Sequence, residues 1–309
     1  MTDWDLDSAV CLFIFNRPES TRQVFKRIRE AQPPRLYVVA DGPRDDVEGE
    51  EERCREVRAV TEDVDWNCEI HRNFAPENYG IKRRFVTGLE WLFEHESEAI
   101  ILEDDCVPSR DFFRFCETML ERYRDDERIW DVTGTNYLET WKPQTGDYHF
   151  SQLGGIWGWA TWRRSWEAYD PEMRLWENEE VRERLRDVLA NDSLAAYAET
   201  VYSRTHRGLI ETWDYQWGFA KQINSGLSVV PAKNLVSNIG FGDGATNTTE
   251  QDRELANVPT HELTFPLERP PAIAVDREYD MTYLRRRTSV WERIPSLRRL
   301  TNRLVLDRK

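Results

Sequence analysis

The first half of the chain alternates short runs of apolar residues with stretches that have the period of an amphipathic helix. Ala9–Phe15 and Leu36–Ala40 are continuous apolar runs, as expected for strands that are buried on both faces. Further strands are predicted around Cys68–Arg72, at Ala99–Leu102 and at residues 129–134. Strands that alternate with helices form βαβ units. The sequence therefore predicts an α/β fold, with a mostly parallel sheet flanked by helices.

Turn residues and apolar stripes predict where the helices lie. One helix follows Pro18, and another runs from Ile81 to about Glu94 after the turn Asn78-Tyr79-Gly80. The second half is expected to contain a polar helical region at 177–207, a helix ending at Asn224 and a strand-like stretch at Leu227–Ile239.

Three of the predicted strands end in polar residues. Asn16-Arg17 follows the first strand, Asp41-Gly42 the second, and Glu103-Asp104-Asp105 the fourth. Ligands of open α/β sheets bind at the carboxyl ends of the strands. We therefore expect these residues to converge on one functional site.

The acidic triplet Glu103-Asp104-Asp105 is the strongest local signal. Three adjacent carboxylates repel one another unless a cation or hydrogen-bond donors compensate them. Mn²⁺ or Mg²⁺, held by one or two carboxylates and by substrate phosphates, would do so and would act as a Lewis acid toward a leaving diphosphate. The alternative is a solvated acidic turn before the next helix. The position at a strand end favours the metal.

Basic residues near the same edge are candidate phosphate contacts. Arg17, Lys82 and Arg83 supply positive charge there, and each is also a common type of surface residue. Asp41 either accepts hydrogen bonds from a nucleobase or ribose or forms the turn before Gly42, and the two roles are compatible.

Asp214 stands between Trp213 and Tyr215 at the predicted start of a helix. A carboxylate against aromatic rings suits a general base that removes a hydroxyl proton. The alternative role is that of a helix N-cap, for which Asp is favoured.

Tryptophans concentrate in the second half, where nine of the 13 lie between residues 130 and 217. Most are expected in the core, as hydrophobic mass with a polar tip. We expect Trp157, Trp159 and Trp213 to be exposed and to bind a carbohydrate acceptor, because sugar rings pack their C–H faces on such side chains.

Charge and motifs exclude several classes of function. The net charge is -15, and residues 282–309 carry nine basic and two acidic side chains, which leaves -22 on the rest. Such an acidic body would repel nucleic acid. The sequence has no GxGxxG, no GxxxxGK[ST] and no catalytic-triad motif, so dinucleotide and P-loop chemistry have no support.

Several features favour a cytoplasmic location. No apolar run approaches the roughly 18 residues of a membrane span, and the N-terminus is acidic where a signal peptide would be basic. The five cysteines are odd in number and form no CxxC pair, which predicts reduced core residues.

Seven sequence blocks resemble a bacterial and archaeal group of glycosyltransferases with the Rossmann-like GT-A fold. The blocks are FNRPEST (15–21), ADGPR (40–44), GLEWLFE (88–94), AIILEDDCVPSRDFFRFC (99–116), WGWATWRRSW (157–166), TWDYQW (212–217) and LVSNIGFG (235–242). The acidic triplet, the Phe-rich helix after it and the Trp213-Asp214 pair are also loosely similar to animal N-acetylglucosaminyltransferase I, an inverting, Mn²⁺-dependent enzyme.

This resemblance implies metal-dependent transfer of a sugar from a nucleotide-diphospho-sugar, with a UDP-sugar favoured, to a glycan or lipid-linked acceptor. Asp105 would bind Mn²⁺ or Mg²⁺, and Asp214 would be the catalytic base. The residues expected to bind the nucleotide sugar are Asn16, Arg17, Asp41, Lys82, Arg83, Glu103 and Asp104. The group often has Cys at the position of Ile81 and His at that of Asn247, so no ligand is assigned in residues 240–249.

Two other functions share part of the pattern. A sugar-nucleotide pyrophosphorylase would have a similar sheet, but it requires a Gly-rich basic loop where this chain has FNRPEST. A non-catalytic carbohydrate-binding protein would keep the tryptophans without needing the acidic triplet.

We expect a single catalytic domain over residues 1–255, followed by a linker and a basic helical tail over 256–309. The domain would have a nucleotide-sugar half (1–134) and an acceptor half (135–255). Residues 284–306 interleave apolar residues with Arg. This pattern suits either an anionic membrane surface, which would make the protein peripheral at the inner face of the membrane, or docking on an acidic body, including that of a second subunit in a homodimer.

Overall fold

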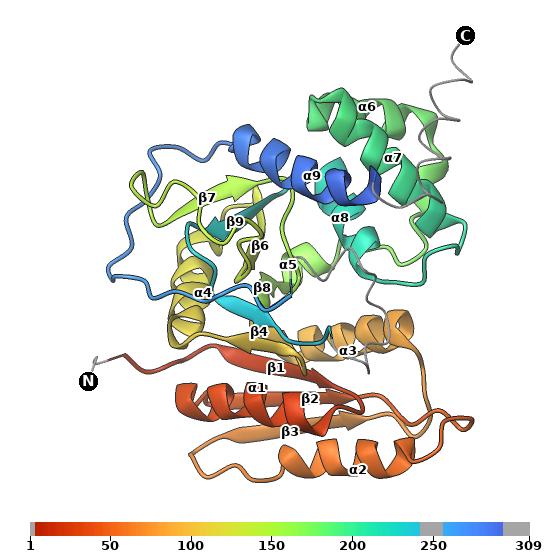
Figure 1. Ribbon diagram of the computed structural model, residues 1–309, viewed down its shortest axis with the longest axis vertical. Coiled ribbons are helices and arrows are strands. Elements are labelled where there is room, and N and C mark those ends of the chain that lie inside the picture. The colour runs from red at the N-terminus through yellow and green to blue at the C-terminus, as the bar shows by residue number, and fades with distance from the viewer. Residues whose placement is uncertain (1–3, 242–255, 293–309) are drawn as a thin grey trace.

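The computed structural model describes residues 4–241 and 256–292, with side chains up to residue 286. Within these ranges, the centre is an eight-stranded sheet in the order β3-β2-β1-β4-β8-β6-β9-β7 (Figure 1). The strands are β1 (Ala9–Ile14), β2 (Arg35–Ala40), β3 (Glu69–Phe74), β4 (Glu98–Glu103), β6 (Ile129–Thr133), β7 (Tyr148–Ser151), β8 (Trp159–Trp162) and β9 (Leu227–Pro231). The predicted α/β fold is confirmed.

Helices cover both faces of this sheet and form a further layer at one end. They are α1 (Pro18–Ala31), α2 (Glu50–Val60), α3 (Ile81–His95), α4 (Arg110–Tyr123), α5 (Arg163–Trp166), η1 (Arg174–Glu177), α6 (Glu179–Leu189), α7 (Asp192–His206), α8 (Asp214–Ile223) and α9 (Arg277–Glu292). The side chains of Asn178 and Asn191 cap α6 and α7 by accepting hydrogen bonds from backbone N–H groups.

The direction of the strands changes across the sheet. β3, β2, β1 and β4 pair in parallel, and they correspond to predicted strands. β8 is antiparallel to both β4 and β6, and β7 is antiparallel to β9, whereas β6 and β9 are parallel. A separate antiparallel pair joins β5 (Cys106–Pro108) to β10 (Val236–Asn238). β5, β7 and β8 are not predicted from the sequence.

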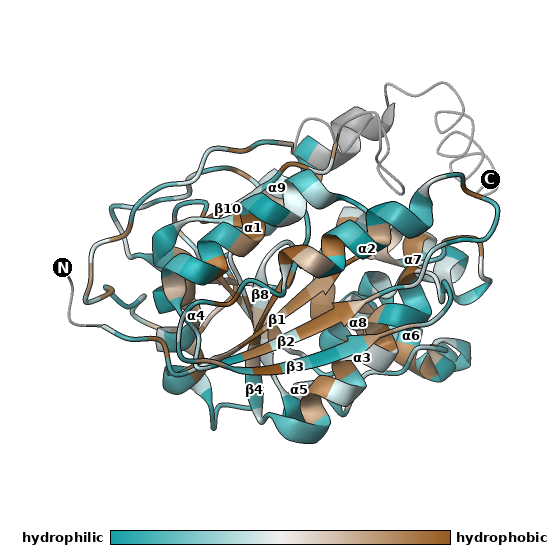
Figure 2. Ribbon diagram, turned by 90° about the horizontal axis from the view of Figure 1, so that it is seen from below, coloured by the Kyte–Doolittle hydropathy of each residue, from teal (hydrophilic) through white to brown (hydrophobic). Residues whose placement is uncertain are grey.

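Alternate residues of β1 face opposite sides of the sheet. Val10 and Leu12 pack in one core with α1, α2 and α4, and Cys11 and Phe13 pack in a second core with α3 and α8. Figure 2 shows the resulting pattern, with brown central strands and largely teal helices outside them. Burial on both faces explains why the sequence of this strand is apolar throughout.

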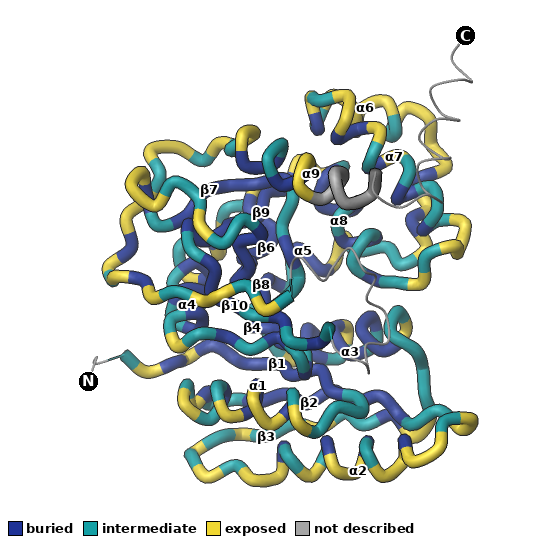
Figure 3. Tube along the Cα trace, in the orientation of Figure 1, coloured by how far each residue is buried: buried dark blue, intermediate teal, exposed yellow. Residues whose placement is uncertain are grey.

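A third core joins α6 and α7 to η1, α8 and α9. The outer turns of α6 are exposed, as Figure 3 shows in yellow. Tyr279 of α9 is fully buried, and Leu263 and Leu267 belong to the first core. Residues 256–286, predicted as linker and start of the tail, therefore pack against the body. Most of the predicted basic tail, residues 293–309, lies outside the described residues.

The five cysteines are free thiols, and four of them are buried, as the sequence predicts. Over residues 4–241 and 256–292, no helix has the length and hydropathy required to cross a bilayer.

Candidate active site

The acidic triplet lies where the central strand β4 ends and the chain turns into β5. Asp104 is buried, and its Oδ2 accepts a hydrogen bond from the backbone N–H of Phe15 at 3.0 Å. Arg17 donates from Nη1 to Oδ2 of Asp105 at 2.5 Å, and the same nitrogen lies 3.8 Å from Oδ1 of Asp104. The ends of β1 and β4 therefore meet, as expected from their polar residues.

The charges of the triplet are only partly compensated. Burial and the charges of Asp105 and Asp104 raise the pKa of Glu103 well above its usual range. Burial and Asp105 raise the pKa of Asp104 to about 7. Oε1 of Glu103 is buried and has no hydrogen-bond partner among the described residues. Clustered carboxylate oxygens with unmet charge fit a hard divalent cation such as Mn²⁺ or Mg²⁺.

The triplet does not form a complete protein cage for a metal. In the part of the chain that the structure describes, no three His, Cys, Asp or Glu side chains are arranged to hold an ion. Mg²⁺ is usually held by one or two carboxylates together with substrate phosphates and water. The residues present therefore fit a cation that is shared with a phosphorylated ligand.

Gly240 packs directly against Asp105. The backbone N–H of Ile239 donates to the carbonyl oxygen of Asp105 at 2.9 Å, next to the pairing of β10 with β5. A Cβ on Gly240 would lie 2.0 Å from Oδ2 of Asp105 and 3.1 Å from Nη1 of Arg17. A side chain at this position would therefore displace the carboxylate of Asp105. This contact is not predicted from the sequence, because it depends on the β5–β10 pairing.

The side chain of Asp41 holds a turn. Its Oδ1 accepts from the backbone N–H groups of Gly42 and Tyr79, both at 2.9 Å. Its Oδ2 accepts from the N–H of Gly80 at 3.1 Å and from Nδ2 of Asn78 at 3.2 Å. Asp41 thus has the predicted turn-forming role. A nucleotide would have to share carboxylate oxygens of Asp41 that already accept hydrogen bonds from the turn.

Asn16 belongs to a network centred on Glu50, which is fully buried. Nδ2 of Asn16 donates to Oε1 of Glu50 at 2.7 Å. Arg44 donates to Glu50 from Nη2 at 2.6 Å, from Nε at 2.9 Å and from its backbone N–H at 2.7 Å. Glu50 therefore connects the loops after β1 and β2. Neither Glu50 nor Arg44 is predicted from the sequence as a site residue.

Lys82 and Arg83 occupy the first turn of α3. Nζ of Lys82 forms an ion pair with Oε1 of Glu172 at 3.1 Å. The guanidinium of Arg83 lies over the ring of Tyr79, 4.0 Å from its centroid. These are the contacts of the two side chains in the structure, and their binding of a diphosphate stays a prediction.

Trp159 and Trp213 are each only 1% exposed, so the prediction that they lie at the surface is wrong. Trp213 stacks on Phe85 at 4.7 Å and on Trp159 at 5.6 Å, and Phe85 in turn stacks on Phe13 at 4.1 Å (centroid distances). These rings fill the space between β1, α3 and α8. An acceptor could not stack on rings that are enclosed in this way. Trp157, in contrast, is half-buried.

Asp214 is the first residue of α8, and its charge acts on Glu103 of the acidic triplet. Burial, Asp105 and Asp104 are the larger causes of the raised pKa of Glu103, and the charge of Asp214 contributes further. The hydroxyl of Thr212 donates to Oδ1 of Asp214. The N-cap position belongs to Trp213, so the alternative N-cap role of Asp214 is wrong. The burial of Trp213 fixes the start of the helix that carries Asp214.

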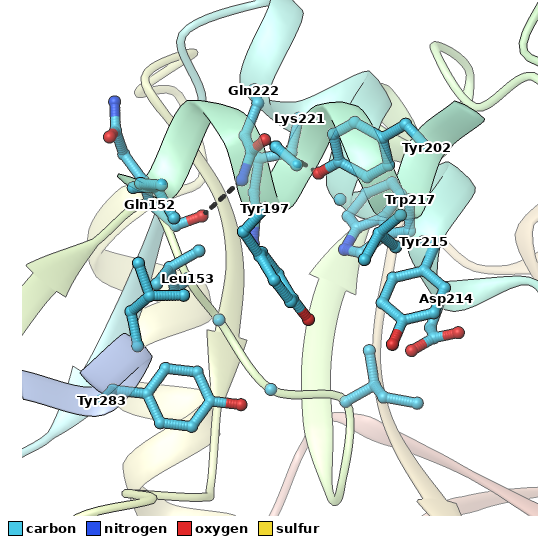
Figure 4. A pocket seen from close by; sticks show the side chains of 18 of the residues that line it. Gln152, Leu153, Tyr197, Tyr202, Asp214, Tyr215, Trp217, Lys221, Gln222 and Tyr283 are labelled. Carbon is cyan, nitrogen blue, oxygen red and sulfur yellow. Dashed lines mark hydrogen bonds between the residues drawn. The ribbon is translucent and has the colours of Figure 1, made fainter. Parts of the chain in front are cut away.

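A pocket of about 110 Å³ lies beside Asp214, between residues 152–156 and the helices α7, α8 and α9 (Figure 4). Tyrosines from all three helices line it. None of Trp157, Trp159 and Trp213 is among the described residues of its wall.

A buried ion pair joins α8, the helix that begins with Asp214, to the sheet. Nζ of Lys221 lies 2.9 Å from Oδ2 of Asp131 and 2.5 Å from Oγ of Ser228, and Nε1 of Trp217 donates to the same oxygen of Asp131 at 2.9 Å. The side chains of Lys221 and Asp131 are each 3% exposed. Lys221 therefore joins α8 to β6 through Asp131 and to β9 through Ser228. These contacts are not predicted from the sequence.

Three solved structures illustrate what the chain is similar to. The mannosyltransferase PcManGT from Pyrobaculum calidifontis, in complex with GDP-Man and Mn²⁺, is 13% identical with a TM-score of 0.34, over 52% of this chain and 46% of that chain. HddC from Yersinia pseudotuberculosis is 7% identical with a TM-score of 0.32, and its complex with GMP-PN is 10% identical with a TM-score of 0.31. Both matches cover 51% of this chain and 77% of the other.

The chain thus spans less than half the length of the mannosyltransferase. Likeness at these identities and TM-scores carries no functional information. No family model matches the sequence, and no curated protein matches it.

Proposed function

We propose that this chain is a glycosyltransferase that moves a sugar from a nucleotide-diphospho-sugar to a hydroxyl of a glycan or lipid-linked acceptor. One observation carries the proposal: Asp214 lines a pocket and lies close enough to Glu103 for its charge to contribute to the raised pKa of that carboxyl. The triplet with Arg17 suits a charged diphosphate, and Asp214 suits the activation of a hydroxyl beside it.

On the donor side, the guanidinium of Arg17 would turn from Asp105 to the diphosphate, which it can bind through two oxygens. Asp105 would hold Mn²⁺ or Mg²⁺ together with diphosphate oxygens, and that ion would supply Lewis-acid stabilisation of the leaving group when bound. Glu103 and Asp104 would contact the nucleotide sugar. Asn16, Asp41, Lys82 and Arg83 are the further donor-side residues proposed from the sequence.

On the acceptor side, Asp214 would accept the proton of the acceptor hydroxyl. The acceptor oxygen would attack the anomeric carbon from the face opposite the diphosphate, which inverts the configuration. A new C–O bond forms, and the bond from the anomeric carbon to the diphosphate breaks, with its electron pair leaving on the nucleoside diphosphate. The hydroxyl of Thr212, which donates to Oδ1 of Asp214, would orient the carboxylate.

Thermal stabilisation would identify the donor. Full-length protein is heated with UDP-, GDP- and dTDP-sugars, each with MnCl₂ or with EDTA. Because a ligand that binds the native state raises the Tm, we expect one nucleotide class, with UDP favoured, to raise it only when the metal is present. Sugar transfer that continues at the full rate in EDTA would contradict the role of the metal.

Substitution of Asp214 tests the base. Asp214→Asn should lower kcat by about 10²- to 10⁴-fold and leave the donor-induced Tm shift in place. Asp192→Asn is the matched control, because Asp192 is also the first residue of a helix and is exposed. Normal turnover by Asp214→Asn would exclude Asp214 as the base.

The two alternative functions differ in their products. A pyrophosphorylase would need a sugar 1-phosphate and would exchange pyrophosphate. A non-catalytic carbohydrate-binding protein would release no nucleotide. Metal-dependent release of nucleoside diphosphate from the nucleotide sugar would therefore support the transferase.

The proposed membrane contact or homodimer involves the basic tail, most of which lies outside the described residues. Co-sedimentation of full-length protein with anionic vesicles, compared with a form that lacks residues 293–309, tests the membrane contact. Light scattering of the same two proteins tests the dimer.

A further inference from the structure

The pocket beside Asp214 has walls from five separate parts of the chain, one of which is residues 152–156. Tyr197 comes from α7, Tyr215 from α8, Tyr283 from α9, and Tyr137 from the segment after β6. Figure 4 shows the hydroxyl groups of Tyr197 and Tyr283 directed into the space between them, and that of Tyr215 next to the carboxylate of Asp214. A ligand in this space would meet flat apolar faces and phenolic hydroxyls together.

The remaining lining combines apolar side chains with neutral amides. Leu153, Leu194 and Val201 supply aliphatic surface, and Gln152 and Gln222 supply amide groups. Pockets for small ligands commonly have this composition, in which apolar walls give contact area and a few polar groups fix orientation. Such a surface complements a sugar ring, which has an apolar C–H face and hydroxyl groups around its edge.

The charges of the lining favour an uncharged ligand. Lys221 reaches the pocket wall, but its ammonium is held by Asp131 and Ser228 on the sheet side. Among the lining residues that the structure describes, no other cation faces the pocket, and burying an anionic ligand without a compensating cation is unfavourable.

Helix α9 completes the pocket. The ring of Tyr283 stacks on that of Tyr137 with centroids 4.6 Å apart and an interplanar angle of 11°. Tyr137 also contacts Trp157 edge-to-face at 5.5 Å, so the aromatic wall continues to this half-buried side chain. The buried carboxylate of Asp280 fixes the helix by accepting from the hydroxyl of Ser151 and, at 3.2 Å, from the backbone N–H of Gln152.

We infer that this pocket binds an uncharged hexose ring, the terminal sugar of the acceptor, and that Tyr283 of α9 determines which ring fits. The identity of the ring as an acceptor rests on the proposed transferase function, whereas its binding in the pocket does not. The acceptor site thus consists of tyrosines from α7, α8 and α9, in place of the predicted Trp157, Trp159 and Trp213.

The test uses full-length protein without nucleotide sugar and detects ligands by saturation-transfer NMR. The probes are the methyl glycosides of glucose, galactose, mannose and N-acetylglucosamine, together with the methyl glycosides of glucuronic and galacturonic acid. We expect at least one neutral glycoside to bind and both uronates to bind at least tenfold more weakly than it. If no neutral glycoside binds, or a uronate binds more tightly, the inference is overturned.

Variants of the wall locate the binding. Tyr283→Ala should weaken binding of the neutral glycoside at least tenfold, and Tyr283→Phe, which keeps the ring, should weaken it less. Met281→Ala is the matched control, because Met281 is on the same helix, is partly buried and does not line the pocket. If Tyr283→Ala does not fold, Tyr197→Phe and Tyr283→Phe together provide the test. Unchanged binding in every folded wall variant would overturn the inference.

A donor measurement separates this inference from the proposed function. The Tm shift produced by the nucleotide sugar with Mn²⁺ should be the same in the wild type and in Tyr283→Ala. If hexosides bind in a Tyr283-dependent way but no nucleotide sugar binds, the pocket is supported and the transferase is not. If nucleotide sugar binds and hexoside binding is unchanged in Tyr283→Ala, the proposed transferase function is supported and the assignment of the pocket is overturned.

Discussion

Glu50 and the acidic triplet lie at the same edge of the sheet, but their carboxylates are compensated in opposite ways. Glu50 accepts hydrogen bonds from the side chains of Asn16 and Arg44. Burial would raise the pKa of Glu50, but these donors outweigh it and lower the pKa to about 2. In the acidic triplet, burial and Asp105 raise the pKa of Asp104 to about 7, and an oxygen of Glu103 has no partner among the described residues.

The difference shows that burial alone does not reveal what a carboxylate is for. A carboxylate that is saturated with donors stabilises the fold and has little capacity left for a ligand. A group of carboxylates that lacks compensation costs stability, and such strain concentrates at functional sites. The two sites share a segment of the chain, because the backbone N–H of Phe15 donates to Asp104 and the side chain of its neighbour Asn16 donates to Glu50.

The largest effect that would sharpen this contrast is expected at Asp105. Asp105→Asn should reduce nucleotide-sugar turnover about 1000-fold, or about 4 kcal/mol in activation free energy, because the donor loses its proposed metal ligand. Its free energy of unfolding should not fall. Asp46→Asn, an exposed change in the loop after β2, is the control. A loss of several kcal/mol in stability would mean that the triplet is structural, like Glu50.

The opposite behaviour is expected at Glu50. Glu50→Gln should lower the free energy of unfolding by about 3 kcal/mol, because the guanidinium of Arg44 loses a buried charged partner. Glu51→Gln, one residue along α2 and exposed, should have little effect. Denaturant titrations of both variants against the wild type provide the measurement. Equal stabilities for the Glu50 and Glu51 variants would remove the basis of the comparison.

The stability difference between the wild type and Glu50→Gln should depend on pH, with a sign that follows from the pKa of Glu50. The folded pKa of Glu50, about 2, lies below the ordinary value of 4.5. Its contribution to stability is therefore fully present above about pH 4.5 and is lost as the pH falls toward 2. The stability difference between wild type and Glu50→Gln should shrink over this range, and a difference that is constant from pH 5 to pH 3 would contradict the assignment.

A smaller, favourable effect is expected at Asp104. Asp104→Asn removes one of three neighbouring negative charges and keeps an oxygen for the N–H of Phe15, so the free energy of unfolding at pH 7.5 in EDTA should rise by about 2 kcal/mol. Turnover should fall in the same variant. A less stable Asp104→Asn protein would show that the triplet is better compensated than its contacts indicate.

The smallest effect is the coupling between the two sites. Glu50→Gln and Asp104→Asn act on adjacent residues, Asn16 and Phe15, so their effects on unfolding should deviate from additivity by about 0.5 kcal/mol. A double-mutant cycle measures this term. Strict additivity would show that the two sites are energetically independent despite their shared segment.

The parts of the fold that could be predicted are those that local sequence specifies. β1, β2 and β4 are predicted to within about a residue at each end, because strands that are buried on both faces have unbroken apolar runs. β8 is not predicted, because its Trp-Ala-Thr-Trp sequence becomes a strand through pairing with β4, where Trp159 lies opposite Ile101. That pairing depends on contacts distant in the chain.

In the candidate site, too, features set by local sequence could be predicted, and features set by distant contacts could not. The strand ends at Arg17 and at Asp104-Asp105 could be predicted to meet, since parallel strands place their carboxyl ends at one edge. The burial of Trp213 could not, because the ring is enclosed by Phe85 and Trp159 from other elements. Glu50 is one of three consecutive glutamates in the sequence, and only the fold distinguishes it by placing Arg44 and Asn16 against it.

The stacked rings of Phe13, Phe85 and Trp213 have a consequence for how the proposed donor and acceptor sides keep their separation. Rings in van der Waals contact act as a spacer of fixed thickness, here with centroid steps of 4.1 and 4.7 Å between β1 and the residue that precedes Asp214. The reach from one side to the other is therefore a length set by side-chain thickness. Exchanging one ring for an aliphatic side chain would change that length, and with it the geometry between the two proposed sides, without altering any residue of the proposed site.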